Sequence, residues 1–359
     1  MIRSAFSGKR VLVTGHTGFK GSWMSMWLAK AGAEVVGYAL APNTERDNFV
    51  VSGVEQMLVE SVIADTRDAD RLREVVEKHR PEVVFHLAAQ PLVRYSYDHP
   101  AETFHTNVVG AANVLDAVRA VGTSKATVVI TSDKCYRNNE WEWGYREADV
   151  LGGHDPYSAS KAAEELVVSC YRDSFFGPAG LPLASTRAGN VIGGGDWSVD
   201  RIVCDAIRAF EAGTSLGVRS PASTRPWQHV LEPIGGYLLL AARMLAEPGR
   251  YAEPFNFGPD AAAVYNVGRL CDMASAAWGE GAAWQQVGQP TVHEAGLLAL
   301  DSSRAHHVLG WSPLLSVDEA VEWTVGWYRA RFDGGDMAAF TGDQIARYEA
   351  RAEAAWRQF

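Results

Sequence analysis

The sequence contains no long uninterrupted apolar run, no surplus of basic residues and only four cysteines among its 359 residues. No segment approaches the roughly 18 consecutive apolar residues that a membrane-spanning helix needs, so we expect no membrane partner. The formal net charge of −10 argues against nucleic acid as a partner, because nucleic acid requires a basic face. An anionic small molecule stays compatible with this charge, since individual arginines can bind it.

Cysteine is too sparse and too scattered to build a site. Cys135, Cys170, Cys204 and Cys271 form no C-x-x-C pair, so the sequence predicts neither a metal site nor a disulfide framework. We expect each of them to be a small packing residue in or near the core. The opening stretch MIRSAFSGKRVLVTG runs into a strand pattern instead of a signal sequence, which favours a cytosolic protein.

Apolar runs that alternate with amphipathic stretches dominate the first half of the chain. RVLVTG, AEVVGYAL, EVVFHLAA and ATVVITS have the apolar character of buried strands. Residues 19–32 and 101–122 show helical spacing, and the first of these helices is predicted to end at Gly32. This alternation predicts a Rossmann-type doubly wound α/β fold with a parallel sheet covered on both faces. The helices at 101–121 and 157–176 carry apolar residues on more than one face, which predicts pairing in a homodimer or homotetramer.

The second half of the chain has a looser pattern. After about residue 187, segments rich in glycine, tryptophan and proline follow, such as GNVIGGGDW and STRPWQHVLEP. SVDEAVEWTVGWYRARF and TGDQIARYEARAEAAW then show helical patterns. We expect a Rossmann domain over residues 1–187, with later segments at about 225–260 returning to it, and a smaller substrate-binding lobe over 188–359.

A glycine-rich turn separates the first strand from its helix. TGHTGFKG places Gly15, Gly18 and Gly21 in the spacing G-x-x-G-x-x-G. Glycines let the backbone approach a pyrophosphate, and the N–H groups at the start of the following helix point at its negative charge. Such a triplet alone also occurs in ordinary tight turns, but the strand before it and the helix after it predict a dinucleotide site.

Two later segments fit the same dinucleotide. In ADTRD, Asp65 follows a strand, where its carboxylate could meet the amine of an adenine. Asp65 could equally be the N-cap of the helix that begins in RDADRLREVVEKH, and the sequence leaves both roles open. In HLAAQ, the small residues Ala88 and Ala89 follow another strand, where the chain must pass close to the nucleotide.

The tip of the second strand departs from a common pattern of dinucleotide sites. Many such sites carry an acidic residue about 20 residues beyond the glycines, which binds the ribose hydroxyls. Here the strand ends in GYALAPNTERD, and no acidic residue stands directly at its tip. Arg46 could meet a 2′-phosphate, so this region alone does not distinguish NADP from NAD, which Asn43 or Thr44 would help to bind.

The pair Tyr157 and Lys161 in YSASK lies four residues apart on a predicted helix and therefore on one face. An ammonium beside a phenol stabilises the phenolate and lowers a pKa that is otherwise about 10, so the tyrosine can act as a base near neutral pH. Ser132, at the end of the strand in VVITS, could share a substrate hydroxyl with this tyrosine. The strand-end serine makes the pair more specific than Tyr-x-x-x-Lys alone, which is common by chance.

The order TGHTGFKG, HLAAQ, TS, YSASK resembles the extended short-chain dehydrogenase/reductase superfamily over nearly the whole chain. Four longer strings, TGHTGFKGSW, TSDKCY, RAGNVIGGGDW and RPWQHVLEP, resemble one of its families, the CDP-glucose 4,6-dehydratases. This resemblance implies NAD as cofactor and CDP-glucose or a similar nucleotide sugar as substrate. It also implies oxidation of the sugar at carbon 4, loss of water across carbons 5 and 6, and return of the hydride to carbon 6.

TSDKCY places a lysine directly beside an aspartate at the end of a strand. Elimination needs a base for the carbon 5 proton, which the carbon 4 ketone makes acidic, and an acid for the departing hydroxyl. By resemblance, Asp133 would protonate the leaving 6-hydroxyl and Lys134 would remove the carbon 5 proton. As a base, Lys134 needs a pKa well below about 10.4, which burial and the neighbouring cation Lys161 would favour. Without the resemblance, a simple ion pair between Asp133 and Lys134 would be the preferred interpretation.

Recognition of the sugar nucleotide is expected from the second lobe. By resemblance, Asn190 in RAGNVIGGGDW lies near the substrate's pyrophosphate, while Arg219 and Arg225 could hold phosphates or be solvated surface charges. Arg304 in SSRAHHVLGWSP is a weaker candidate. The predicted site residues are, as catalytic groups, Ser132, Asp133, Lys134, Tyr157 and Lys161; as cofactor ligands, Gly15, Thr17, Gly18, Phe19, Lys20, Gly21, Asp65, Thr66, Leu87, Ala88, Ala89, Asn107, Tyr157 and Lys161; and as substrate ligands, Gln90, Asn190, Arg201, Arg219 and Arg225.

Three classes of function fit the motifs to different degrees. A 4,6-dehydratase, for CDP-glucose or another nucleotide sugar, uses every motif. A nucleotide-sugar 4-epimerase would use Ser132, Tyr157 and Lys161 but has no need of the acid–base pair at 133 and 134. A non-catalytic dinucleotide sensor that binds a protein partner could dispense with the tyrosine and the lysine.

Overall fold

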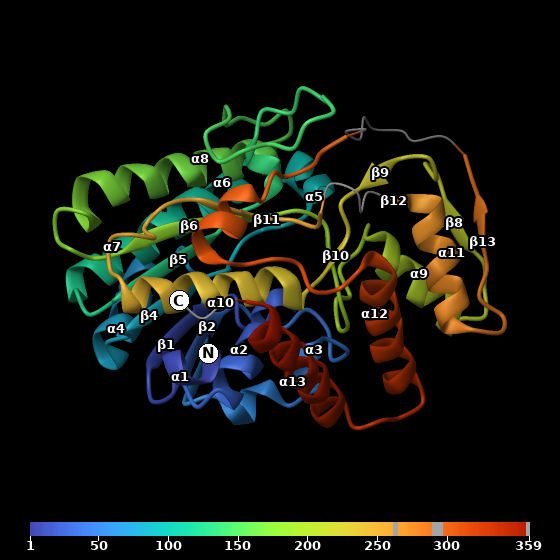
Figure 1. Ribbon diagram of the computed structural model, residues 1–359, viewed down its shortest axis with the longest axis horizontal. Coiled ribbons are helices and arrows are strands. Elements are labelled where there is room, and N and C mark those ends of the chain that lie inside the picture. The colour runs from blue at the N-terminus through green and yellow to red at the C-terminus, as the bar shows by residue number, and fades with distance from the viewer. Residues whose placement is uncertain (261–264, 289–296, 357–359) are drawn as a thin grey trace.

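A parallel sheet of seven strands forms the centre of the computed structural model, which describes residues 1–260, 265–288 and 297–356 (Figure 1). The strand order is β11-β6-β5-β4-β1-β2-β3. The strands are β1 (Arg10–Thr14), β2 (Glu34–Ala39), β3 (Glu60–Ile63), β4 (Val83–His86), β5 (Ala126–Ile130), β6 (Leu183–Ala188) and β11 (Phe255–Phe257). The order changes direction between β1 and β4, as in doubly wound α/β sheets, so the predicted fold class is confirmed.

Helices cover both faces of this sheet. Alternate residues of β1 take opposite sides: Val11 and Val13 belong to the larger hydrophobic core and Leu12 to the smaller one. The helices on and beside the sheet are α1 (Ile2–Phe6), α2 (Phe19–Lys30), α3 (Asn48–Val51), α4 (Ala69–His79), α5 (Val93–Asp98), α6 (Pro100–Phe104), α7 (Gly110–Val121), α8 (Pro156–Tyr171) and α10 (Leu231–Ala246), with the short 3-10 turns η1 (Val54–Met57) and η3 (Asp133–Cys135) and the π-helical segment η4 (Arg172–Phe176). The larger core packs α2 and α10 against the sheet, and the smaller core packs α4, α7 and α8 (Figure 1).

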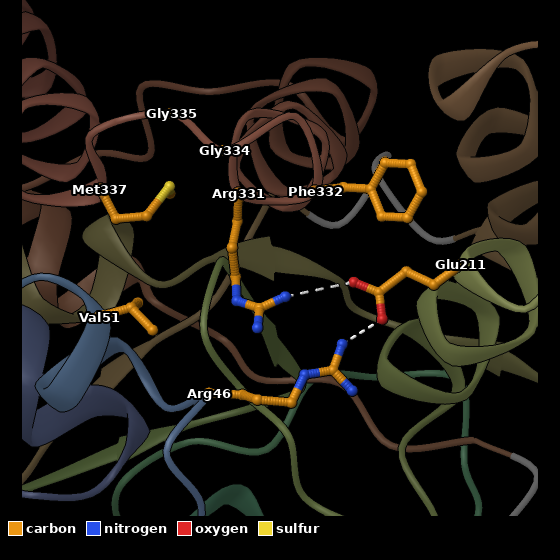
Figure 2. Close-up of a pocket in the computed structure, with 8 residues that line it drawn as sticks. All are labelled: Arg46, Val51, Glu211, Arg331, Phe332, Gly334, Gly335 and Met337. Carbon is orange, nitrogen blue, oxygen red and sulfur yellow. Dashed lines mark hydrogen bonds and ion pairs between the residues drawn. The ribbon is translucent and has the colours of Figure 1, made fainter.

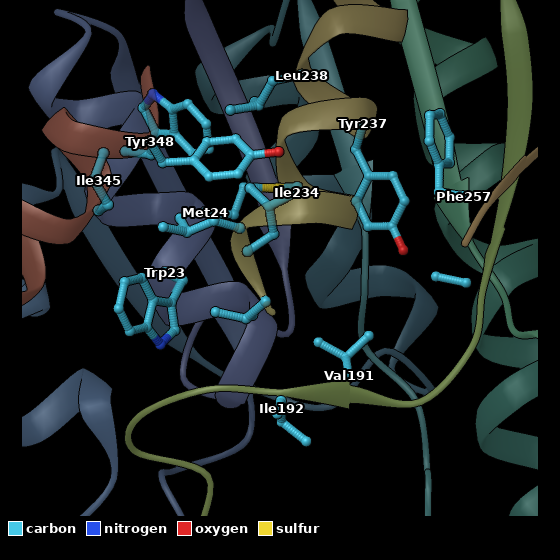
Figure 3. Close-up of a cluster of buried hydrophobic side chains, with 14 of the residues drawn as sticks. Trp23, Met24, Val191, Ile192, Ile234, Tyr237, Leu238, Phe257, Ile345 and Tyr348 are labelled. Carbon is cyan, nitrogen blue, oxygen red and sulfur yellow. The ribbon is translucent and has the colours of Figure 1, made fainter. Parts of the chain in front are cut away.

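Aromatic side chains of α2, α10 and the C-terminal helix α13 (Met337–Ala355) form much of the larger core (Figure 3). Trp23 from α2 and Tyr348 from α13 lie on one side of α10 in this cluster, and Tyr237 of α10 and Phe257 of β11 lie on the other. The Tyr348 hydroxyl donates to the buried Glu232 carboxylate of α10 at 2.7 Å. The amino group of Met1 lies 3.1 Å from Glu353 Oε1. The C-terminal helix therefore packs on the N-terminal half of the chain.

A second, smaller group of elements lies beyond the carboxyl ends of the strands (Figure 1). The π-helical segment η5 (Ala305–Leu309) packs instead against α10 and β11. The smaller group contains α9 (Ile202–Glu211), α11 (Val267–Trp278) and α12 (Val317–Phe332). Three two-stranded sheets join them: β7 (Val191–Ile192) with β10 (Gln228–His229), β8 (Leu216–Val218) with β13 (Trp284–Gln286), and β9 (Thr224–Arg225) with β12 (Tyr265–Asn266). Both helical patterns predicted near the C-terminus are present, as α12 and α13.

The helix predicted over 101–121 is not continuous. It consists of α6, a π-helical segment η2 (His105–Val109) and α7. The segment η2 contains Asn107, whose side chain bonds to the Gln90 backbone and donates to Ser160 Oγ at 2.8 Å. Widened helical turns of this kind are frequent at functional sites. Here the widening brings Asn107 against both the loop after β4 and helix α8.

One expectation for the cysteines is wrong. Cys135, Cys204 and Cys271 are buried packing residues, but Cys170 on α8 is exposed. Cys170 lies on the outer side of an amphipathic helix, so its single apolar side chain costs little there.

Within residues 1–260, 265–288 and 297–356, no helix is both long and apolar enough to cross a membrane.

Candidate active site

A cavity of about 1920 Å³ opens between the carboxyl ends of the strands and the smaller group of elements. It lies where the strand order changes direction between β1 and β4, which is where open α/β sheets bind ligands. All of the predicted catalytic and substrate residues line this cavity. Every predicted cofactor residue lines it as well, except Asn107, which supports the cavity wall from behind through Gln90. The structure thus brings together groups that are far apart in the sequence.

The glycine-rich turn between β1 and α2 has the shape that a dinucleotide needs. Gly15 has a φ of +76°, and a Cβ there would lie 2.7 Å from the Ala88 backbone nitrogen. A Cβ on Gly21 would collide with the Gly15 carbonyl. Gly18 is the N-cap of α2, so the free N–H groups of the first helical turn border the cavity. The residues present therefore fit a pyrophosphate at the start of α2.

Asp65 follows β3 and lines the cavity, as the adenine interpretation requires. The alternative role as a helix N-cap is wrong, because Asp68 caps α4 by accepting a hydrogen bond from the Arg71 N–H at 3.0 Å. The Asp65 carboxylate binds the Arg67 guanidinium, with Nη2 2.6 Å from Oδ2. This hydrogen bond from Arg67 holds the pKa of Asp65 below its usual value, so the group is a carboxylate at neutral pH.

Arg46 does not reach the dinucleotide cavity, which corrects the suggestion that it meets a 2′-phosphate. Figure 2 shows Arg46 and Arg331 directed at the same carboxylate, Glu211, in a separate pocket of about 690 Å³. The Arg46 guanidinium also stacks 3.5 Å from the Trp197 ring centroid. Helices α9 and α12 both end at this pocket, and their carbonyl ends favour cations. The positions of Arg46 and Arg331 therefore follow from the charge of Glu211 and from the carbonyl ends of α9 and α12.

The loop after β2 is fixed from within. Asp47 accepts hydrogen bonds from the backbone N–H groups of Asn43 and Thr44, at 2.9 and 3.1 Å, and from the Thr44 hydroxyl at 2.7 Å. Asn43 and Thr44 line the cavity, and the Arg46 carbonyl accepts from Trp197 Nε1 at 2.7 Å. The loop next to the expected ribose is thus attached to the smaller group of elements through Arg46 and Trp197.

Helix α8 carries the predicted tyrosine and lysine. Asp155 caps its first turn by accepting from the Ser158 N–H at 2.9 Å, and the Tyr157 N–H donates to Ser96 Oγ at 3.1 Å. Tyr157 and Lys161 both line the cavity, as four-residue spacing on one helix face requires. The position of the phenol is therefore set by backbone contacts that do not involve its hydroxyl.

The acid–base pair lies on η3, directly after β5. Asp133 is nearly fully buried, and its Oδ1 accepts from Ser132 Oγ at 3.0 Å. Its second oxygen, Oδ2, is buried without a hydrogen-bond partner among the described residues. Lys134 Nζ lies 3.9 Å from Asp133 Oδ1, and its side chain is 32% exposed, so the expected burial of Lys134 is incomplete. A buried carboxyl with a vacant oxygen suits a proton donor to a substrate hydroxyl.

The sequence predicts Lys20 as a cofactor ligand. In the structure, Lys20 lies close enough to the predicted catalytic residues to interact with their charges. Its ammonium interacts with Asp133 and Lys161 and, on the substrate side, with Arg201 and Asp196. Burial, together with the positive charges of Arg201 and Lys161, lowers the pKa of Lys20 to about 8. Lys20 is therefore a second lysine near Asp133, which sequence reasoning did not assign to the chemistry.

The predicted substrate residues have different surroundings. Arg201 binds Asp196 Oδ2 at 2.9 Å and is half-buried in the cavity wall. Arg219 is exposed at the rim, and Arg225 donates to the Thr224 carbonyl at 2.7 Å. The weaker candidate Arg304 lies outside the cavity, where it pairs with Glu253. Arg201 and Arg219 therefore line the cavity, whereas Arg304 does not.

Comparison with known proteins identifies close relatives of this chain. A sequence profile described as GDP-mannose 4,6 dehydratase matches residues 12–324. The chain is 48% identical over 351 residues to the CDP-glucose 4,6-dehydratase of Salmonella typhimurium, which covers 96% of this chain and 98% of that protein.

Solved structures share the fold at lower sequence identity. Epimerase Mth375 of Methanothermobacter thermautotrophicus aligns with a TM-score of 0.80 at 23% identity, over 92% of this chain and 95% of the other. The dTDP-glucose 4,6-dehydratase of Bacillus anthracis, solved in complex with NAD, aligns with a TM-score of 0.76 at 17% identity, over 92% of this chain and 100% of the other. Since an epimerase and a dehydratase both match, the fold alone does not choose between these reactions.

Proposed function

Because the chain belongs to the GDP-mannose 4,6 dehydratase family of extended short-chain dehydrogenase/reductases, we propose that it dehydrates CDP-glucose to CDP-4-keto-6-deoxyglucose with NAD as cofactor. The observation that carries this proposal is the Asp133 and Lys134 pair beside Tyr157 and Lys161 in one cavity. A 4-epimerase would have no use for an acid–base pair at this strand end. The 48% identity to a CDP-glucose dehydratase supports CDP-glucose over other nucleotide sugars.

The residues that would hold the cofactor are those of the glycine-rich turn, the loop after β4 and the end of β3. When bound, NAD supplies a hydride acceptor that later returns the hydride to the sugar. Tyr157 would take the proton of the carbon 4 hydroxyl, and the Lys161 ammonium would stabilise the phenolate that this role requires. Ser132 would orient the same hydroxyl from the end of β5.

The second step is the elimination of water, for which the residues of η3 would supply the acid and the base. After oxidation at carbon 4, the carbon 5 proton is acidic because the ketone delocalises the negative charge. Lys134 would remove this proton, and Asp133 would donate a proton to the departing 6-hydroxyl through its free Oδ2. The Lys134 side chain is 32% exposed, and bound substrate would cover it. Lys134 would return its proton to carbon 5 as the hydride comes back to carbon 6, and exchange with solvent would then remove the proton held by Tyr157 and restore the one lost by Asp133.

The substrate is expected to lie between the two groups of elements. Asn190, Arg201, Arg219 and Arg225 line the cavity and are proposed to bind the sugar nucleotide. Guanidinium groups bind phosphate oxygens in bidentate fashion, which lysine does not. We also propose a cytoplasmic site of action, supported by four cysteines that form no disulfide.

The direct test is incubation of the purified protein with NAD and, in parallel, CDP-, dTDP-, GDP- and UDP-glucose. We expect a 4-keto-6-deoxy product from CDP-glucose, at a specificity constant at least about 100-fold above the other three. Mass spectrometry detects the product as the loss of one water. Conversion to the carbon 4 epimer without loss of water would replace the dehydratase proposal with the epimerase.

We further propose that the protein forms a homodimer or homotetramer through α6, α7 and α8. Phe104 is 37% exposed, Val109 42%, Leu166 61% and Phe175 42%, and all lie on these helices or on the turns that adjoin them. Apolar side chains gathered on adjoining helices favour burial against a second copy. Light scattering at micromolar concentration is expected to give at least twice the 39.1 kDa chain mass. A monomer under these conditions would contradict the proposal.

A further inference from the structure

Two buried glutamates follow Lys161 on α8, and their surroundings differ. The Glu165 carboxylate accepts hydrogen bonds from Ser185 Oγ and Arg187 Nη2 of β6, each at 2.8 Å, and from the hydroxyl of Thr131, which follows β5. This carboxylate ties α8 to the sheet and is fully explained by the fold. Within the described residues, the one side-chain hydrogen bond of Glu164 comes from Lys161 Nζ at 2.7 Å, and its Oε1 is buried without a partner. Among the described residues, the contact with Lys161 is therefore the one polar side-chain interaction that accounts for a buried glutamate at this position.

We propose that Glu164 is a positioning residue, which holds the Lys161 ammonium in place and offsets the charge that Lys161 presents to Tyr157. The inference rests on the proposed function to the extent that Tyr157 and Lys161 form the catalytic pair. The side chains of Lys161 and Glu164 are 3% and 1% exposed, one helical turn apart. Lys161 Nζ also donates to the Ile130 carbonyl at 3.4 Å. The ammonium is thus fixed between the end of β5 and Glu164.

The charges around Lys161 show why Glu164 matters to the phenol. The titratable groups that interact with Lys161 are Lys20 from α2, His86 from β4, and Tyr157, Glu164 and Glu165 from α8 itself, with Asp133 of η3 next to Lys20. Burial, aided by the Lys161 charge, lowers the pKa of His86 to about 3, so this ring is neutral. Glu165 is matched by Arg187. Glu164 is therefore the anion that most directly balances Lys161.

The protonation state of Glu164 adds a dependence on pH. Burial raises the pKa of Glu164 to about 7, although the Lys161 ammonium opposes this rise. Burial disfavours the charged form of Lys161, but the Glu164 carboxylate and Tyr157 more than compensate, and the pKa of Lys161 lies above its usual value. Above about pH 7 the two side chains form a nearly neutral pair. A smaller positive field then reaches the phenol than a lone ammonium would supply.

The test is the pH at which Tyr157 ionises in the protein without substrate. Ultraviolet difference spectra of phenolate formation are recorded against pH, and the spectra of Tyr157→Phe are subtracted to remove the other tyrosines. Glu164→Gln keeps the size and an acceptor oxygen but removes the negative charge, so we expect the titration midpoint to fall by about one pH unit. With active enzyme, the acidic limb of the kcat/KM profile should move in the same direction.

Two further variants separate charge from simple damage. Glu164→Asp keeps the charge at shorter reach, so we expect a smaller downward shift than in Glu164→Gln. Glu165→Gln is the matched control: it leaves Arg187 buried without its anion, and we expect a larger loss of melting temperature with a smaller shift of the midpoint. An unchanged or higher midpoint in folded Glu164→Gln would overturn the proposal, as would a shift of equal size in Glu164→Asp.

The experiment also distinguishes failure of this inference from failure of the proposed function. The phenolate titration needs no nucleotide sugar, so it gives an answer whatever substrate the protein uses. If Glu164→Gln does not fold, the Asp variant decides: a midpoint equal to or above that of the unsubstituted protein overturns the role of Glu164. A downward shift in the Asp variant supports it.

Discussion

Tyr157→Phe is expected to slow hydride transfer from carbon 4 by about 100- to 10,000-fold while the protein stays folded. The change removes one hydroxyl and leaves the ring, which is 8% exposed, in its packing position. The backbone of this residue is held by Ser96 and by the Asp155 cap, and neither contact involves the phenol. Without the phenol, the proton of the carbon 4 hydroxyl has no positioned acceptor on α8. Rapid mixing with NAD and CDP-glucose, followed through nicotinamide absorbance and product formation, measures the loss.

The matched control is Tyr136→Phe, which removes a buried tyrosine hydroxyl outside the proposed chemistry. The Tyr136 hydroxyl donates to Asn256 Oδ1 at 2.7 Å and accepts from Arg187 Nη1 at 2.7 Å. Its loss leaves those two buried groups short of a partner, which costs about 1–3 kcal/mol of unfolding free energy. We expect a lower melting temperature with turnover changed only a few-fold. Normal turnover in Tyr157→Phe would remove Tyr157 from the mechanism.

Local patterns in the sequence were sufficient to predict the framework of the site. The apolar runs became β1, β2, β4 and β5 because parallel strands covered on both faces are buried, apart from the first residues of β1 and β2. The conformation of the glycine-rich turn depends only on its own backbone and on the chain that follows β4. The glycine spacing was therefore enough to predict a turn between β1 and α2. Tyr157 and Lys161 share one face of α8 because four residues make about one helical turn. In each case the information lies within a few residues.

Contacts between distant segments were not predictable in the same way. Arg46 follows the strand tip in sequence, but its partner Glu211 is 165 residues away. Asn107 looked like part of a continuous helix, and the π-helical segment is stabilised by contacts with residues such as Ser160, 53 positions away. Lys20 lies in the glycine-rich motif, yet its charge interacts with Asp133 and Lys161, which only the folded sheet brings close to it. Glu164 could have been found from its three-residue spacing to Lys161, had the buried face of α8 been known.

Lys134→Ala is expected to lower the overall rate by about 100- to 10,000-fold while the first oxidation still proceeds. Ser132, Tyr157 and Lys161 are unaffected by this change, so they still deliver the first hydride. Removal of the carbon 5 proton then lacks its base, and the reduced cofactor should accumulate together with the 4-keto sugar. Rapid mixing should therefore show a burst of nicotinamide absorbance that the unsubstituted enzyme lacks. Deuterium at carbon 5 of the substrate should slow the variant further, because proton abstraction has become rate-limiting.

The same burst decides between the two lysines near Asp133. Lys134 lies 3.9 Å from Asp133 Oδ1 but is partly exposed, whereas Lys20 is the lysine whose pKa falls to about 8. If Lys134 is the base, Lys20→Met should weaken binding of cofactor or substrate, raising KM without a burst, because it removes a charge but no proton acceptor. If Lys134→Ala turns over normally and Lys20→Met shows the burst, Lys20 is the base. Lys134 would then be no more than the ion-pair partner of Asp133, and its place beside that carboxyl would be structural.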